Sequence, residues 1–289
     1  MPGMSGHGGD LSVTVPPVVR LHLGRAAVQT VADRSHIDLL HIKGDAVEPA
    51  VRPIASPGSD VDVMVHPAEV AALDAELRRL GWRVYSTFTS GSPFGHAQTY
   101  LHDMWGFLDL HRCFPGIGLE PGQAFGRLWA TRRTIVVAGV TCPVPSIPDQ
   151  AVILILNAAR ARRSIELIES WDGLPPEFRR QIEREVDALG AHLAFDAAFG
   201  RLDAYRQARE YRLWKAVTQG GGRVEEWWGR LLAAPTLAAR VGVVLRAPLV
   251  NHAHLEHRLG RQPTRRDVVR EFFDRPLRGL RELVRRRRP

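Results

Sequence analysis

The chain has 289 residues, of which 45% are hydrophobic and 24% charged, with a formal net charge of +8. This length allows one large domain or two ordinary ones, and the composition is typical of a globular protein. No apolar run approaches the roughly 18 residues of a membrane span, and the N-terminus lacks the pattern of a signal peptide. The two cysteines, Cys113 and Cys142, have no spacing that suggests a disulfide framework or a zinc site. We therefore expect a cytoplasmic protein that does not associate with membranes.

The positive charge comes almost entirely from arginine. Of the 39 Lys and Arg residues, only Lys43 and Lys215 are lysine. Such a bias fits GC-rich codon usage, which would place arginine wherever any cation suffices, so the charge indicates only a mild preference for anions. A lysine that persists in this background is therefore more informative than it would be elsewhere.

The first half of the chain alternates predicted helices and strands. Residues 1–17 are rich in Gly and Pro, which predicts a flexible N-terminal arm. Apolar spacing then predicts helices over 18–33, 67–81 and 121–131. Strands are predicted over 37–43, 59–65 and 82–89, as a pair within 96–113 joined by a turn around 103–106, and as a short strand or hairpin over 134–144.

The character of the sequence changes after residue 145. Segments 148–171, 175–219, 223–247 and 263–286 read as helical, and Gly- and Pro-containing breaks separate them. The predicted class is α+β, with a mixed sheet and its helices in residues 18–145 and an α-helical domain with a basic tail in residues 146–289.

Two aspartates stand inside the predicted strand "GSDVDVMVHP" (58–67). Residues two apart in a strand point to the same face, so Asp60 and Asp62 share one face and the intervening valines share the other. Two like charges at this spacing repel each other unless a cation lies between them. Carboxylate oxygens suit Mg²⁺, with Mn²⁺ as a second candidate, because magnesium is usually held by one or two carboxylates plus substrate phosphates.

A later strand, "FLDLHR" (107–112), supplies a third carboxylate, Asp109, between two leucines. His111 is two residues further on and shares its face. The alternative is structural, with Asp60 as a cap and Asp109 as a salt-bridge partner. The combination of D-x-D with a second charged strand favours a functional site over that alternative.

These motifs together resemble the DNA-polymerase-β-like nucleotidyltransferases. The similarity is to an uncharacterised bacterial group with a KG…DxD…DLH pattern, here "LLHIKG" (39–44), "SDVDVMV" (59–65) and "LDLH" (108–111). "PSIPDQAVILILNAAR" (145–160) is similar to the helix that opens the C-terminal half of that family. The resemblance covers about residues 20–170. It departs from the family at Asn157, where relatives often carry histidine, and Arg52 is the candidate for the arginine that usually precedes the aspartates.

The resemblance implies a nucleotidyltransferase-fold mixed sheet, with residues 18–145 as the catalytic domain. The implied reaction transfers a nucleoside monophosphate from an NTP such as ATP to an acceptor and releases pyrophosphate. Asp60, Asp62 and Asp109 would be the catalytic metal ligands. Lys43, Gly44, Ser59 and His111 would contact the nucleotide; a glycine that follows a strand lets the backbone approach a phosphate, and a lysine can reach it as a point charge.

The acceptor stays open at this point, with a small molecule, a peptide or a protein favoured. RNA, as in a tRNA-modifying toxin-like enzyme, is less favoured, because arginines such as Arg160, Arg162 and Arg163 are spread along helices beside acidic residues. A different class is a nucleotide-binding interaction module without turnover. Three further patterns carry less weight: His252, His254 and His257 lack a fourth metal ligand, "QGGGR" (219–223) lacks the rest of a P-loop, and Trp214, Trp227 and Trp228 have the spacing of core residues.

Overall fold

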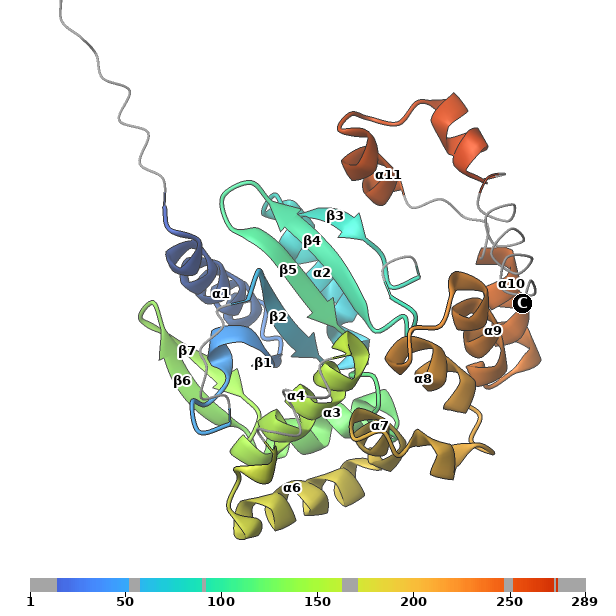
Figure 1. Ribbon diagram of the computed structural model, residues 1–289. Coiled ribbons are helices and arrows are strands. Elements are labelled where there is room, and N and C mark those ends of the chain that lie inside the picture. Colours follow the sequence, from blue (N-terminus) through green and yellow to red (C-terminus); the bar gives the residue numbers. More distant parts are fainter. Residues whose placement is uncertain are drawn as a thin grey trace, which may run out of the picture.

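The computed structural model describes residues 15–51, 58–89, 92–162, 171–246, 252–272 and 274. Its first half is built as the alternation of apolar patterns predicts (Figure 1). The elements in chain order are α1 (Pro17–Arg34), β1 (Leu39–His41), the 3₁₀ helix η1 (Gly44–Ala46), β2 (Asp60–Val65), the 3₁₀ helix η2 (Pro67–Glu69), α2 (Val70–Arg79), β3 (Arg83–Ser86), β4 (Ala97–His102), β5 (Gly106–His111), α3 (Pro121–Ala130), β6 (Arg133–Val137) and β7 (Val140–Val144).

The second half is helical throughout its described part. Its elements are α4 (Ile147–Ala161), α6 (Pro176–Leu189), α7 (His192–Ala198), the 3₁₀ helix η3 (Leu202–Tyr205), α8 (Tyr211–Thr218), α9 (Arg223–Ala233), α10 (Leu237–Arg246) and α11 (His252–Leu259). None of the helices in the described residues is long and apolar enough to cross a membrane. The mixed sheet followed by helices confirms the predicted α+β class.

The central sheet has five strands in the order β1-β2-β5-β4-β3. Strand β2 pairs with β5 in parallel, whereas β1–β2, β4–β5 and β3–β4 are antiparallel. Strands β2 and β5, which carry the predicted site carboxylates, are therefore neighbours within the sheet. Strands β6 and β7 form a separate two-stranded hairpin.

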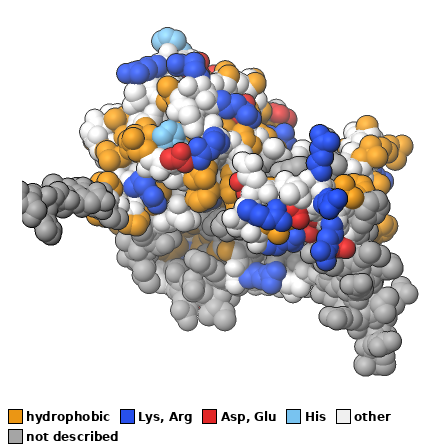
Figure 2. Space-filling view, turned by 90° about the horizontal axis from the view of Figure 1, so that it is seen from above, with side chains coloured by type: hydrophobic (Ala, Val, Ile, Leu, Met, Phe, Trp, Pro, Cys, Tyr) orange, Lys and Arg blue, Asp and Glu red, His pale blue; other side chains and the backbone are white. Residues whose placement is uncertain are grey.

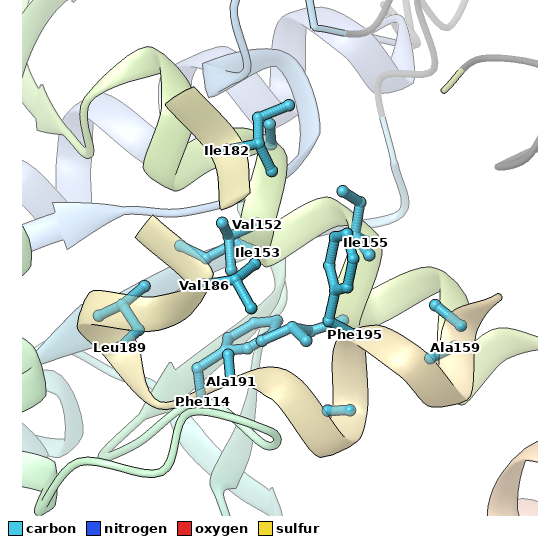
Figure 3. Close-up of a cluster of buried hydrophobic side chains, with 14 of the residues drawn as sticks. Phe114, Val152, Ile153, Ile155, Ala159, Ile182, Val186, Leu189, Ala191 and Phe195 are labelled. Carbon is cyan, nitrogen blue, oxygen red and sulfur yellow. The ribbon is translucent and has the colours of Figure 1, made fainter. Parts of the chain in front are cut away.

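Each face of the sheet contributes to its own apolar cluster. Val61, Val63 and Val65 lie in a cluster with side chains of α1 and α2, so those helices cover the valine face. Met64, on the aspartate face, belongs to a second cluster that extends into α3, α4, α6, α7 and α8. Figure 3 shows part of this second cluster, where side chains of α4, α6 and α7 meet, among them Ile153, Val186 and Phe195. The helical half thus packs onto the aspartate face of the sheet, and the domain boundary at residue 145 stays a prediction.

The structure differs from the predicted elements mainly in the helical half. The predicted helical segment 175–219 is interrupted by two glycines, Gly190 and Gly200, with positive φ angles of 61° and 75°. Because this conformation ends an α-helix, Gly190 ends α6 and Gly200 follows the end of α7, and the rest of the segment forms η3 and α8. Most of the predicted N-terminal arm (1–17), Arg52, Arg163 and the basic tail lie outside the described residues.

Candidate functional site

Asp62 and Asp109 lie opposite each other on adjacent parallel strands. The register pairs Asp62 with Asp109 and Asp60 with Phe107. Since alternate residues share a face, Asp60 and Asp62 of β2 and Asp109 and His111 of β5 all belong to the same face of the sheet. The structure therefore places the three predicted carboxylates and the predicted histidine on one face, where Asp62, Asp109 and His111 form a close cluster that does not include Asp60.

Asp62 is the most enclosed of the three carboxylates, with 5% of its side chain exposed. Its Oδ1 forms an ion pair with Nζ of Lys43 and lies 2.9 Å from Nε2 of His111. Burial alone would raise the pKa of Asp62, but Lys43 and His111 outweigh it and hold that pKa at about 2. Burial also lowers the pKa of His111 to about 4, so the neutral imidazole donates its Nε2–H to Asp62 at neutral pH. Asp62 is thus a fixed negative charge over the whole physiological range.

The surroundings of Asp109 shift its pKa in the opposite direction to that of Asp62. Burial, together with the nearby charge of Asp62, raises the pKa of Asp109 to about 6. Its Oδ1 accepts a hydrogen bond of 2.6 Å from the hydroxyl of Thr99, which faces it from β4. Thr99 holds the carboxylate in one orientation while leaving its charge largely uncompensated.

Asp60 begins β2 beside two glycine turns. Gly58 and Gly44 have φ angles of 77° and 68°, a conformation that disfavours residues with a Cβ atom, and a Cβ built on Gly58 would lie 3.9 Å from the Gly44 Cα. Ser59 donates a 3.3 Å hydrogen bond to Oδ1 of Asp60, and burial followed by the Asp62 charge raises the Asp60 pKa. Two backbone turns thus meet at the open end of the acidic cluster.

The Gly44 turn is held from behind by Arg25 of α1, which is 1% exposed. Its Nη2 donates to the Lys43 carbonyl at 3.2 Å and to Oδ1 of Asp45 at 2.8 Å. Its Nη1 lies 3.2 Å from Nδ1 of His41, which is also buried. Gly44 opens a three-residue 3₁₀ helix, and a buried cation fixes this turn.

The donor atoms at this face suit a divalent cation. One ligand atom each from Asp62, Asp109 and His111 can be chosen so that all lie within 4.8 Å of one another. Carboxylate oxygens are the ligands that Mg²⁺ and Mn²⁺ prefer. Burial, and after it repulsion from Asp62, raises the pKa values of Asp60 and Asp109, and a cation here would relieve that repulsion. The residues present therefore fit a metal ion.

A cavity of about 320 Å³ opens beside Asp109, on the side of β4 and β3. Thr99, His96 and Ser86 line it from the sheet side, and Asn157 and Arg160 line it from α4. Helix α4 is positioned by its N-cap, where Oγ of Ser146 accepts a 3.3 Å bond from the Asp149 backbone. Residues three apart on a helix share a face, so α4 presents Asn157 and Arg160 to the cavity together.

Sequence reasoning identified the acidic residues and Lys43 but missed several neighbours. Arg25, Thr99 and His96 belong to no motif, and from the sequence Arg160 is only one of several arginines spread along the helical half. A signal for Arg160 existed, because it and Asn157 are polar residues at i, i+3 in the otherwise apolar stretch "AVILILNAAR" (151–160). Trp214 is buried as its spacing predicts, whereas Trp228 is 52% exposed. The side chains of His252, His254 and His257 lie outside the described set.

No protein-family model matches the sequence, and no curated protein matches it. One solved structure with some backbone similarity is the solution structure of the antibiotic-resistance factor ANT(2'')-Ia. It is 16% identical in sequence, its TM-score is 0.36, and the match covers 65% of this chain and 91% of that chain. A match at this level assigns no family, so the function is inferred from the site itself.

Proposed function

We propose that the protein is a metal-dependent nucleotidyltransferase that transfers a nucleoside monophosphate from an NTP to an acceptor hydroxyl or phosphate. The observation that carries this proposal is the facing pair Asp62 and Asp109 on parallel strands, with Asp60 on the same face and Lys43 and the Gly44 turn beside it. An acidic cluster next to a lysine and two close backbone turns is suited to a metal-bound triphosphate.

Asp60, Asp62 and Asp109 would hold Mg²⁺ or Mn²⁺. When bound, the metal would neutralise the phosphate charge and the charge that develops during transfer. Lys43 is paired with Asp62 in the structure, so a cation that binds Asp62 competes with it and leaves its ammonium group available to the phosphates. His111 would orient Asp62 through its Nε2–H, and Ser59 and the Gly44 backbone would contact the triphosphate.

In the proposed reaction, an acceptor oxygen attacks the α-phosphorus of the NTP. A new O–P bond forms as the bond from the α-phosphorus to the bridging oxygen breaks, and that electron pair leaves with pyrophosphate. Asp109 accepts the proton of an acceptor hydroxyl and later releases it to water. In the metal-free site its pKa of about 6, against about 2 for Asp62, makes Asp109 the more basic of the two facing carboxylates.

Thermal denaturation with Mg-NTP tests nucleotide binding. Each of the four Mg-NTPs is added to the wild type, and the same NTPs are added in EDTA. We expect at least one NTP to raise the Tm far more with Mg²⁺ than with EDTA, because a ligand that binds only the folded state stabilises that state. Asp62→Asn should remove most of that gain. Asp103→Asn is the matched control, because Asp103 is paired with Arg83 at an exposed turn. An equal gain in wild type and Asp62→Asn, with all four NTPs, would count against the metal–nucleotide site.

Pyrophosphate release separates an enzyme from a binding module. Asp109→Asn should still bind Mg-NTP, because Asp60, Asp62 and Lys43 remain, but should lose pyrophosphate release in the presence of cell extract as a source of acceptors. A wild type that binds Mg-NTP tightly and releases no pyrophosphate with any acceptor would instead be a nucleotide-binding module.

An RNA acceptor is a weaker candidate for this site. On the face shown in Figure 2, arginine and lysine side chains lie in separate groups with acidic and apolar side chains between them. A continuous basic stripe is the usual footprint of nucleic-acid binding. We expect weak RNA binding that is independent of sequence and lost between about 50 and 200 mM salt; sub-micromolar binding of one RNA at about 150 mM salt would reverse this preference.

A further inference from the structure

We infer that the cavity beside Asp109 is the acceptor site, and that Arg160 selects a small acceptor that carries a carboxylate or phosphate group. This inference rests on the proposed function, since it names the acceptor class of that reaction. Its basis is the placement of one arginine, without a carboxylate partner among the residues that the structure describes, beside the reacting face of the sheet.

Arg160 is held in place by a neutral group. Its Nη1 lies 2.9 Å from Nε2 of His96, and Nδ1 of His96 lies 2.7 Å from Oγ of Ser92. Burial first, and then nearby cations including Arg160, hold the pKa of His96 far below its usual range. Because Nε2 accepts from the guanidinium, the His96 ring donates from Nδ1 to Ser92. The chain Ser92–His96–Arg160 therefore orients the arginine without neutralising it.

Arg160 forms no ion pair with a carboxylate within the described ranges. Asp62 and Asp109 are the acidic side chains whose charge Arg160 feels most, and both belong to the proposed metal site. Once a divalent cation occupies those carboxylates, no other acidic side chain of the described residues forms an ion pair with Arg160. Burying an uncompensated guanidinium is costly, so a bound anion at this position is strongly favoured.

The order of the strands places this anion with the acceptor rather than with the triphosphate. Lys43 and the Gly44 turn lie at the β1 side of the acidic cluster, whereas the cavity lies across Asp109 at the β4 and β3 side. Asp109, the proposed base, lines the cavity itself. An acceptor held there by Arg160 would present its hydroxyl to Asp109, opposite the triphosphate.

The rest of the lining defines the acceptor further. Apart from Asp109 and Arg160, the lining residues are uncharged at neutral pH, including Thr99, Ser86 and Asn157. A volume of about 320 Å³ suits a small metabolite or a single side chain rather than a stretch of polymer. Since Asp109 is the sole acidic residue among the described residues of the lining, the cavity is poorly suited to a polycationic acceptor.

Three probes with one carbon skeleton test this inference: glycerol, glycerate and glycerol 3-phosphate. Their binding to the full chain is measured by calorimetry in a buffer without EDTA. One series contains Mg²⁺ and the NTP that raises the Tm most, and a second series contains Mg²⁺ alone. We expect glycerate or glycerol 3-phosphate to bind at least about ten-fold more tightly than glycerol, since a charge-assisted contact is among the stronger polar interactions. Whether glycerate or glycerol 3-phosphate binds more tightly then shows whether the acceptor carries a carboxylate or a phosphate group.

Three variants assign the preference to Arg160. Arg160→Gln should reduce it to less than about three-fold, whereas Arg160→Lys, which retains the charge, should keep most of it. Arg112→Gln is the matched control, because Arg112 is an exposed arginine that donates to the Gly95 carbonyl and does not line the cavity. Stabilisation by Mg-NTP should be unchanged in Arg160→Gln.

The outcomes separate this inference from the proposed function. Equal affinity of the three probes for the wild type, or loss of Mg-NTP binding in Arg160→Gln, would overturn the acceptor site while leaving the nucleotidyltransferase proposal in place. A wild type that no Mg-NTP stabilises would overturn the proposed function. In that case, an Arg160-dependent preference measured with Mg²⁺ alone would still support an anion site in the cavity.

Discussion

Asp62 and Asp109 are register partners on β2 and β5, yet their environments drive their ionisation in opposite directions. Lys43 and His111 outweigh burial at Asp62 and hold its pKa at about 2, whereas burial and the charge of Asp62 raise the pKa of Asp109 to about 6. One carboxylate is therefore a permanent anion and the other can exchange a proton near neutral pH. Such a divergence between neighbouring acids is typical of sites that combine cation binding with proton transfer.

Asp109→Asn should stabilise the ligand-free protein at neutral pH. The pKa of this acid rises on folding from 3.8 to about 6, so its ionised form weakens the fold at every pH above that range. This loss in the free energy of unfolding is absent below pH 3.8, grows between pH 4 and 6, and reaches roughly 2–3 kcal/mol above pH 6. Urea denaturation of wild type and variant at pH 4 and pH 7.5 measures it. A stability difference that does not change with pH would contradict the raised pKa.

Asp62→Asn should have the opposite effect. The pKa of Asp62 falls on folding from 3.8 to about 2, so its ionised form stabilises the fold above pH 4, and that contribution is lost as the pH falls towards 2. At pH 7.5 the variant should be less stable than wild type by roughly 2 kcal/mol, because Lys43 loses its partner in a partly buried position. The same denaturation series measures it, and stabilisation by this substitution would show that the Lys43 pair contributes nothing.

Lys43→Ala should strengthen the binding of a divalent cation in the absence of nucleotide. Lys43 contacts the same Asp62 oxygen that a metal would use, so the lysine and the cation compete. Titration with Mn²⁺, followed by electron paramagnetic resonance, should show tighter binding to the variant, while stabilisation by Mg-NTP should fall. Lys215→Ala is the control, because Lys215 contacts Tyr211 on α8 and is the other lysine of the chain. Weaker Mn²⁺ binding in Lys43→Ala would mean that the lysine supports the metal site instead of competing with it.

The sequence predicted those parts of the site that depend on local pattern. Alternation along single strands places Asp60, Asp62, Asp109 and His111 on one face wherever those strands lie in the sheet. It could not predict that β2 and β5 are neighbours in the register that sets Asp62 opposite Asp109, because pairing between distant segments is a tertiary property. For the same reason Thr99 and Arg160 could not be assigned, since each reaches Asp109 or its cavity from a different element.

Replacing Arg25 tests how the Gly44 turn is held in place. Arg25 is 1% exposed and donates to Asp45 and to the Lys43 carbonyl, so Arg25→Met would remove the buried cation from both groups and leave Asp45 with its contact to Nε2 of His22. Removing one partner of a buried ion pair costs roughly 3–5 kcal/mol, and we expect a loss of stability of that order in urea denaturation.

Arg78→Met is the control: Arg78 pairs with Asp74 on the surface of α2, with 53% of its side chain exposed, and its loss should cost less than about 1 kcal/mol. If Arg25→Met folds, its stabilisation by Mg-NTP should also fall, because the Lys43–Gly44 backbone loses its support. A variant as stable as Arg78→Met would show that the turn holds its shape without the buried arginine.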